Sequence, residues 1–222
     1  MFKKVLIAED MDFINSGIKS QLTDLGIPAI DYVQYCDEAF LKLKSAHLNN
    51  EPFDLLITDL SFDEDAVEQK ITSGDELVKV VRAEFPTMKI IVFSVEDKEF
   101  RIQTLFNEHK INAYVLKSRE GLRELKKAVQ QLYNSDSIYI SPNVANSMSK
   151  SKAIEISDYD VFIIECLSKG HLQEEISRIL KQKNFSPTSI STIEKRLKFL
   201  KEHFNANNPA HLVSISKDLG LI

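Results

Sequence analysis

The feature that most constrains the fold is a short apolar run that ends in an acid, Leu55-Leu56-Ile57-Thr58-Asp59. A run of this length is typical of a strand that is buried on both faces, as the strands of parallel sheets are. A carboxylate has no place inside such a strand. We therefore expect Asp59 at the carboxyl end, where α/β folds bind their ligands. Taken alone, the pattern leaves open that Asp59 only caps the following turn.

Strand patterns alternate with helical patterns through the first part of the chain. The predicted strands cover residues 4–8, 31–36, 54–60, 89–94 and 113–117. We expect Asp37 to cap the helix that follows the second strand. The alternation predicts an α/β fold with a doubly wound, five-stranded parallel sheet.

Four of the five predicted strands end in polar residues. The acidic pair Glu9-Asp10 stands at the end of the first strand, Asp59 at the end of the third, Ser94 at the end of the fourth and Lys117 at the end of the fifth. The carboxyl ends of parallel strands share one edge of the sheet, so we expect these side chains to converge. Each also has an ordinary explanation by itself. The acidic pair could cap a helix, Ser94 could begin a turn, and Lys117 could be solvated.

The residue types at this edge indicate phosphoryl chemistry. Three clustered carboxylates repel one another unless a hard cation binds, and oxygen ligands suit Mg²⁺. A carboxylate held beside Mg²⁺ can attack a phosphoryl group and form an acyl phosphate. The hydroxyl of Ser94 and the ammonium of Lys117 would then hold the phosphoryl oxygens.

Residues 3–133 resemble the receiver domain of two-component response regulators, which has a flavodoxin-like fold. The resemblance implies that Asp59 is the phosphoacceptor and that its phosphate comes from a sensor histidine kinase. It also implies that Glu9, Asp10 and Asp59 bind Mg²⁺ together with the backbone carbonyl of Ser61.

The same resemblance assigns a switch. Ser94 is the switch hydroxyl, Lys117 is the family's lysine, and Tyr114 stands at the aromatic switch position. Phosphorylation is expected to draw Ser94 toward the phosphoryl group, to turn Tyr114 inward and to strengthen dimers. An ordinary half-buried strand tyrosine remains the alternative for Tyr114.

Two features depart from the family's pattern. The acidic segment Ser61–Ser73 is longer than usual before Gly74, and Ser118 rather than Pro follows Lys117. The long segment could select the kinase that docks, or it could be a solvated excursion.

The second half of the chain has a different pattern. Residues 134–152 are rich in Ser and Asn and are predicted to be a linker, within which residues 137–141 could pack locally. Residues 153–222 show three or four helical patterns. In the helix expected from Ser189 to His203, one face is apolar through Ile190, Ile193, Leu197 and Leu200. The opposite face carries cations, which is typical of a helix-turn-helix that binds double-stranded DNA, although a solvated face would look the same.

Residues 154–222 resemble the output domain of LuxR/NarL-type regulators. Lys169–Ser177 is similar to the scaffold-helix segment, and Ser191-Thr192-Ile193-Glu194-Lys195 to the start of the recognition helix. The chain departs from the pattern in extra residues at 183–188 and in Glu194, which stands where a base is usual. The DNA-contacting residues implied are Ser191, Thr192, Glu194, Lys195 and Lys198.

Composition limits the other possibilities. Residues 150–222 contain 11 Lys and Arg against 9 Asp and Glu, which leaves 17 against 24 in residues 1–149. An acidic front and a mildly basic back indicate different partners for the two halves. No apolar run approaches the roughly 20 residues of a membrane span, and the start lacks the features of a signal peptide. Cys36 and Cys166 lack metal-ligand spacing. We therefore expect a cytoplasmic protein without a membrane partner.

The patterns together predict a transcription regulator with a receiver domain (1–133), a linker (134–152) and a helix-turn-helix domain (153–222). We expect a homodimer, at least when phosphorylated, and a regulator rather than an enzyme. One alternative is a receiver whose helical domain binds protein instead of DNA. A phosphohydrolase with an aspartyl-phosphate intermediate is disfavoured, because Ser61 stands where such enzymes often carry a second Asp.

Overall fold

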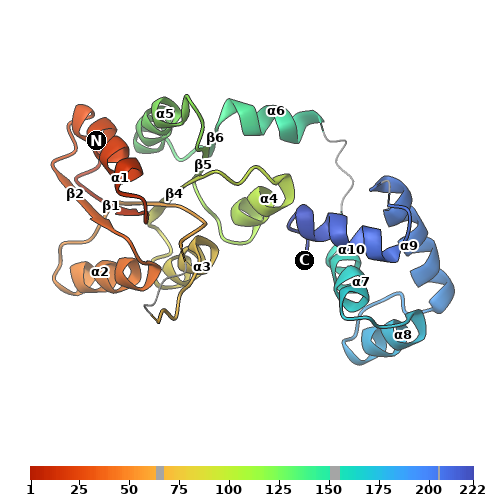
Figure 1. Ribbon diagram of the computed structural model, residues 1–222. Coiled ribbons are helices and arrows are strands. Elements are labelled where there is room, and N and C mark those ends of the chain that lie inside the picture. The colour runs from red at the N-terminus through yellow and green to blue at the C-terminus, as the bar shows by residue number, and fades with distance from the viewer. Residues whose placement is uncertain (64–67, 151–155, 205) are drawn as a thin grey trace. The chain divides into compact units, whose positions relative to one another are not determined.

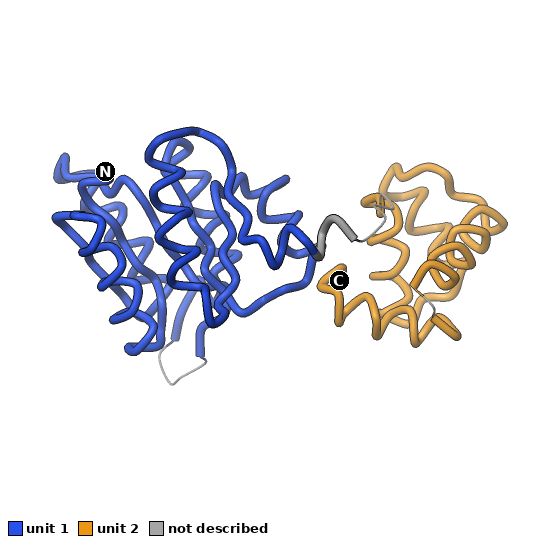
Figure 2. Tube along the Cα trace, turned by 90° about the horizontal axis from the view of Figure 1, so that it is seen from above, with its two compact units in different colours: residues 1–150 blue, residues 151–222 orange. Residues whose placement is uncertain are grey.

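The computed structural model describes residues 1–63, 68–150, 156–204 and 206–222. The chain divides into two compact units, residues 1–150 and residues 151–222, which Figure 2 shows in different colours. The first unit is built on a sheet and the second consists of helices in its described residues (Figure 1).

The sheet of the first unit has six parallel strands in the order β2-β1-β3-β4-β5-β6. The strands are β1 (Lys4–Ala8), β2 (Ala29–Val33), β3 (Leu55–Thr58), β4 (Lys89–Ser94), β5 (Ala113–Leu116) and β6 (Tyr139–Ile140). The helices are α1 (Asp12–Asp24), α2 (Cys36–Leu48), α3 (Gly74–Glu84), α4 (Glu99–Asn107), α5 (Gly121–Asn134) and α6 (Pro142–Lys150). The strand order reverses between β1 and β3, which is where doubly wound sheets bind their ligands.

The apolar strands are buried because helices cover both faces of the sheet. Alternate residues of β3 belong to different core clusters. Leu56 packs with residues of α2, α3 and α4, such as Leu43 and Leu77. Leu55 and Ile57 pack on the other face with residues of α1 and α5. Every residue of β3 is buried, so the strand has a continuous apolar run instead of an alternating pattern.

The predictions for residues 134–152 and for a five-stranded sheet are wrong in part. A sixth strand, β6, adds to the edge of the sheet, where the amide of Tyr139 donates to Asn112 O and that of Ser141 to Tyr114 O. The helix α6 follows, and the boundary between the units falls after Lys150. Residues 151 and 152 lie outside the described residues. The local packing considered for 137–141 is present. The two-residue strand is too short to show a periodicity.

The second strand begins and ends earlier than predicted. Residues 31–36 were expected, but β2 spans Ala29–Val33 and Cys36 begins α2. Asp37 therefore lies in the first turn of α2 and is not its N-cap. Its carboxylate instead accepts the backbone N–H groups of Lys70 and Ile71, at 2.7 and 3.0 Å. It anchors the return of the long Ser61–Ser73 segment, a contact between residues more than thirty positions apart.

The second unit contains α7 (Asp158–Ser168), α8 (Gln173–Gln182), α9 (Ile190–His203) and α10 (Pro209–Asp218). Ser189 is the N-cap of α9, where it accepts from the amide of Thr192. Ile193, Leu197 and Leu200 of α9 are buried, as predicted. Ile190, the first residue of the predicted apolar face, is 41% exposed, so that face is not buried along its whole length. As the first residue of the helix, it lies at the end of the apolar stripe.

A buried ion pair joins α7 to α9. Asp160 is completely buried, and its Oδ1 and Oδ2 lie 2.5 Å from Arg196 Nε and 2.7 Å from Arg196 Nη2. Ser157 completes the environment of this carboxylate with its amide and its hydroxyl. The two-point contact fixes the orientation of α9 as well as its position.

Two further observations concern the cysteines and the helices. Cys36 and Cys166 are both free and buried. Among the described residues, no helix is both long enough and apolar enough to cross a membrane.

Candidate functional site

The carboxyl edge of the sheet brings together three of the predicted residues. Glu9 follows β1, Asp59 follows β3 and Lys117 follows β5. Lys117 Nζ lies 2.6 Å from Glu9 Oε2 and 2.6 Å from Asp59 Oδ2. Glu9 and Asp59 are 1% and 6% exposed. One ammonium is therefore shared by two buried acids that are fifty positions apart in the sequence.

The backbone around Asp59 is closely packed. The amide of Leu60 donates to Asp59 Oδ1 at 2.6 Å, and the amide of Gly74 donates to Leu60 O at 3.0 Å. A Cβ atom on residue 74 would lie 1.8 Å from the carbonyl oxygen of Asp59, so only glycine fits there. The chain thus returns from the long segment directly against the acid, and α3 begins beside it.

Burial raises the pKa of Glu9 to about 7, although the hydrogen bond from Lys117 lowers it. The charge of Asp59 contributes to the increase. The site has more negative charge than the single ammonium offsets. It is therefore suited to a cation or to the loss of one charge.

Asp10 takes no part in the contacts of Lys117 with Glu9 and Asp59. Its Oδ2 accepts the amide of Asp63 at 2.7 Å, which connects it to the long segment. In the described part of the chain, no three side chains of His, Cys, Asp or Glu are placed as a set that could hold a metal ion. Lys117 lies between two of the expected carboxylate ligands. Ser61 is exposed at the start of the segment, and residues 64–67 in its middle lie outside the described residues.

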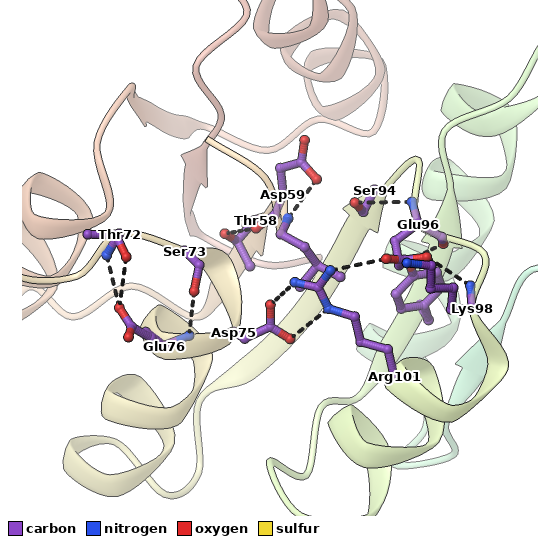
Figure 3. A network of polar contacts seen from close by, with 12 residues as sticks. Thr58, Asp59, Thr72, Ser73, Asp75, Glu76, Ser94, Glu96, Lys98 and Arg101 are labelled. Carbon is purple, nitrogen blue, oxygen red and sulfur yellow. Dashed lines mark hydrogen bonds and ion pairs between the residues drawn. The ribbon is translucent and has the colours of Figure 1, made fainter. Parts of the chain in front are cut away.

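Ser94 and Tyr114 lie on neighbouring strands, and both are completely buried. Ser94 Oγ accepts the amide of Glu96 at 3.4 Å (Figure 3). The hydroxyl of Tyr114 donates to the carbonyl of Glu96 at 2.5 Å. Burial, together with the charge of Glu96, raises the pKa of Tyr114 above its usual range, so the phenol remains a neutral donor. The inward position expected for Tyr114 after phosphorylation is the position that it has here.

The sequence did not predict the contacts of three residues that lie near Ser94 and Tyr114. The guanidinium of Arg101 on α4 contacts Asp75, at the start of α3, and Glu96, in the connection from β4 to α4 (Figure 3). Asp75 directly follows Gly74, and Glu96 is two residues after Ser94. Their positions in the sequence are a weak signal, because nothing in the pattern of α4 distinguishes Arg101 from a solvated cation.

In the second unit, the outward face of α9 carries the predicted polar residues. Ser191, Glu194, Lys195 and Lys198 are exposed. Thr192 is half-buried, and its hydroxyl lies 2.7 Å from that of Ser189, so the N-terminal cap holds it. Phe199, which is 38% exposed, lies under the guanidinium of Arg196. The structure thus presents a helix with a polar and partly cationic outer face.

A doubly wound parallel sheet with buried acids after β1 and β3 and a lysine after β5 defines a receiver-type domain. The family model described as the response regulator receiver domain matches residues 5–130, more than half of the chain. The chain belongs to the response regulator receiver family. No curated protein sequence matches the chain.

The fold is similar to that of several solved structures of the response regulator RcsB. One from Salmonella typhimurium has a TM-score of 0.68 at 23% identity, over 97% of this chain and 99% of its own. A structure of two RcsB dimers bound to two parallel DNAs has a TM-score of 0.63 at 24% identity, over 96% of both chains. RcsB from Salmonella enterica serovar Typhimurium, bound to promoter rprA in the presence of phosphomimetic BeF3-, has a TM-score of 0.64 at 22% identity. That match covers 95% of this chain and 96% of its own.

Proposed function

We propose that this chain is the response regulator of a two-component system and that Asp59 accepts phosphate from a sensor histidine kinase. The observation that carries the proposal is the contact of Lys117 with both Glu9 and Asp59 at 2.6 Å. It supports the proposal because it joins two buried acids and an ammonium at the carboxyl edge of the sheet. The chain acts as the substrate of the kinase and as a regulator, and not as an enzyme.

Mg²⁺ is the proposed cofactor. Glu9, Asp10 and Asp59 would hold it through carboxylate oxygens, with the backbone carbonyl of Ser61 as a further ligand. The donor set fits a hard cation, because all these ligands are oxygens and the acids outnumber the one ammonium. The bound ion would neutralise charge on the phosphoryl oxygens.

Each residue of the site would then have its own role in the transfer of the phosphoryl group. A carboxylate oxygen of Asp59 forms the bond to phosphorus while the phosphorus–nitrogen bond to the kinase histidine breaks. Lys117 would leave Asp59 and bind a phosphoryl oxygen, and the hydroxyl of Ser94 would donate to another. Tyr114 fills the core behind Ser94.

Labelling with acetyl phosphate and Mg²⁺ tests the acceptor. We expect one acid-labile phosphate per chain, detected by mass spectrometry, and none in Asp59→Asn. Asp54→Asn is the matched control, because Asp54 lies at the other end of the same strand, where it accepts the amides of Lys3 and Lys4. Unchanged labelling of Asp59→Asn would exclude Asp59 as the acceptor.

The second unit is proposed to be a LuxR-type helix-turn-helix domain that binds double-stranded DNA as a homodimer once Asp59 is phosphorylated. The exposed row of Ser191, Lys195 and Lys198 on α9 supports a helix in the major groove. Thr192 and Glu194 would contact DNA from the edges of the same face. The RcsB dimers bound to DNA have this overall fold, which favours DNA over protein as the target.

Binding to DNA selected from a random pool separates the two lysines. We expect Lys198→Ala to weaken binding to all DNA sequences alike, because it removes a phosphate contact. The slope of log affinity against log salt concentration should fall by about one unit. Lys195→Ala should cost about 1–3 kcal/mol at one base position, because Lys195 lies nearer the centre of the outward face. Lys217→Ala, an exposed change on α10, is the control. Unchanged affinity of both variants at low salt would instead support a protein target.

A further inference from the structure

Arg101 connects two segments that approach the site from different strands. Its Nη1 lies 3.1 Å from Glu96 Oε2, and its Nε lies 3.3 Å from Asp75 Oδ1, while Nη2 contacts the other oxygen of Asp75. About a third of the Arg101 side chain is exposed, at 32%, against 28% for Asp75 and 13% for Glu96. The hydrogen bond to Asp75 raises the pKa of Arg101 above its usual range.

Each partner of Arg101 is next to, or in contact with, a residue of the proposed switch. Asp75 directly follows Gly74, the glycine that packs against the carbonyl of Asp59. Glu96 donates its amide to Ser94 Oγ and accepts the hydroxyl of Tyr114 at its carbonyl. Its second carboxylate oxygen accepts the amide of Lys98. Figure 3 shows the guanidinium between the two acids.

We propose that Arg101 is a positioning residue for the switch, because it holds the β4–α4 connection to the start of α3 and so keeps a buried partner for the hydroxyl of Tyr114. Without Arg101, the carboxylate of Glu96 keeps only the amide of Lys98 among these contacts, and the connection can move away from Tyr114. Without its bond to Glu96, the hydroxyl of Tyr114 keeps only its contact with the side chain of Ser94. The loss of one of two partners is unfavourable for a buried hydroxyl, so Tyr114 would then leave the core more often. The burial of Tyr114 stands on its own observations, while the link to Asp59 rests on the proposed function.

The shape of the guanidinium is essential to this role. Arg101 uses separate nitrogen atoms for the two acids, which a planar fork with five donors allows. A lysine would retain the charge but present it at one point, so it could serve Asp75 or Glu96 but not both in this geometry. Arg101→Lys is therefore expected to behave more like Arg101→Ala than like the wild type.

The test follows Tyr114 by 19F NMR of the full chain labelled with 3-fluorotyrosine, with its resonance assigned from Tyr114→Phe. We expect Arg101→Ala to raise the fraction of exposed Tyr114 about fivefold, as for the loss of a partly exposed charged contact. Arg123→Ala is the matched control, because Arg123, on α5, forms an exposed pair with Glu120, the residue before the helix. Acetyl phosphate with Mg²⁺ should move the Tyr114 resonance little in the wild type, where the ring is already inward, and should return it toward the wild-type position in Arg101→Ala.

A second set of variants separates positioning from general loss of structure. In the background Asp75→Asn with Glu96→Gln, Arg101→Ala should have little further effect, because its partners are already neutral. The proposal is overturned if Arg101→Ala leaves the Tyr114 resonance unchanged, or if its effect is the same in that background. Failure of the proposed function would look different, since wild-type labelling at Asp59 would then be absent while the Tyr114 resonance still responded to Arg101→Ala.

Discussion

Each unit contains a buried carboxylate paired with a cation, and the two pairs differ in how completely the acid is satisfied. In the second unit, Asp160 receives two contacts from Arg196 and two more from Ser157. In the first unit, Glu9 shares the one ammonium of Lys117 with Asp59. The two acids are equally buried, at 0% and 1% exposure, so burial alone does not distinguish them.

The pKa values of the two acids shift in opposite directions. Burial by itself raises the pKa of Asp160, but the hydrogen bonds from Arg196 and Ser157 outweigh it, and the net pKa is lowered. Burial raises the pKa of Glu9 to about 7, and Lys117 offsets only part of that effect. A completed pair stabilises the fold. An incomplete one leaves charge that a bound cation can neutralise, which is why the second kind marks a functional site.

The largest expected effect comes from breaking the complete pair. Arg196→Met should destabilise the second unit by about 3 kcal/mol, because it leaves Asp160 buried without its compensating charge. Hydrogen exchange of the α9 amides in the full chain measures this locally. Arg178→Met, an exposed change on α8, is the control. Equal losses in the two variants would show that the buried pair has no special contribution.

The contact of Lys117 with Glu9 and Asp59 predicts a pH dependence of stability whose sign is opposite to that expected for the pair of Asp160 and Arg196. The folded pKa of Glu9 is raised above its ordinary value of 4.5, so its stabilising contribution is present at low pH and lost as pH rises through about 7. Without divalent cations, the free energy of unfolding of the first unit should fall by about 2 kcal/mol between pH 5 and pH 8. Urea unfolding measures the loss, which should be absent in Glu9→Gln. The lowered pKa of Asp160 instead gives stability that is lost as pH falls.

The smallest expected effect comes from an ion pair that is not buried, so it tests what pairing contributes without burial. Glu120 and Arg123 form a pair at 3.0 Å in which both side chains are more than half exposed. Glu120→Gln should change the free energy of unfolding by less than about 0.5 kcal/mol, because solvent screens such pairs. Thermal unfolding of the full chain measures it. If Glu120→Gln lost as much free energy of unfolding as Arg196→Met, then pairing and not burial would determine the cost of breaking an ion pair.

Much of the first unit could be predicted because parallel strands have a strong signal in the sequence. The apolar runs identified β1, β3, β4 and β5, and the register of a parallel sheet then brought Glu9, Asp59 and Lys117 to one edge. The strand β6 was missed because its two residues depend on pairing with β5 and not on any pattern of their own. The contacts of Asp37 were missed for the same reason, because the amides that it binds belong to a distant segment of the chain.

The sequence by itself determined the existence of β1, β3, β4 and β5, the amphipathic helices and the residue types at the candidate site, because each depends on local periodicity and on the fixed geometry of strands. Only the tertiary structure decided which charges are satisfied. Nothing in the sequence distinguishes the environments of Arg101, Lys117 and Arg196. Arg101 bridges two acids near Ser94 and Tyr114, Lys117 is shared between two buried acids, and Arg196 completes a pair. The difference arises because the energy of a charge depends on the groups that surround it in space, and those groups come from segments far apart along the chain.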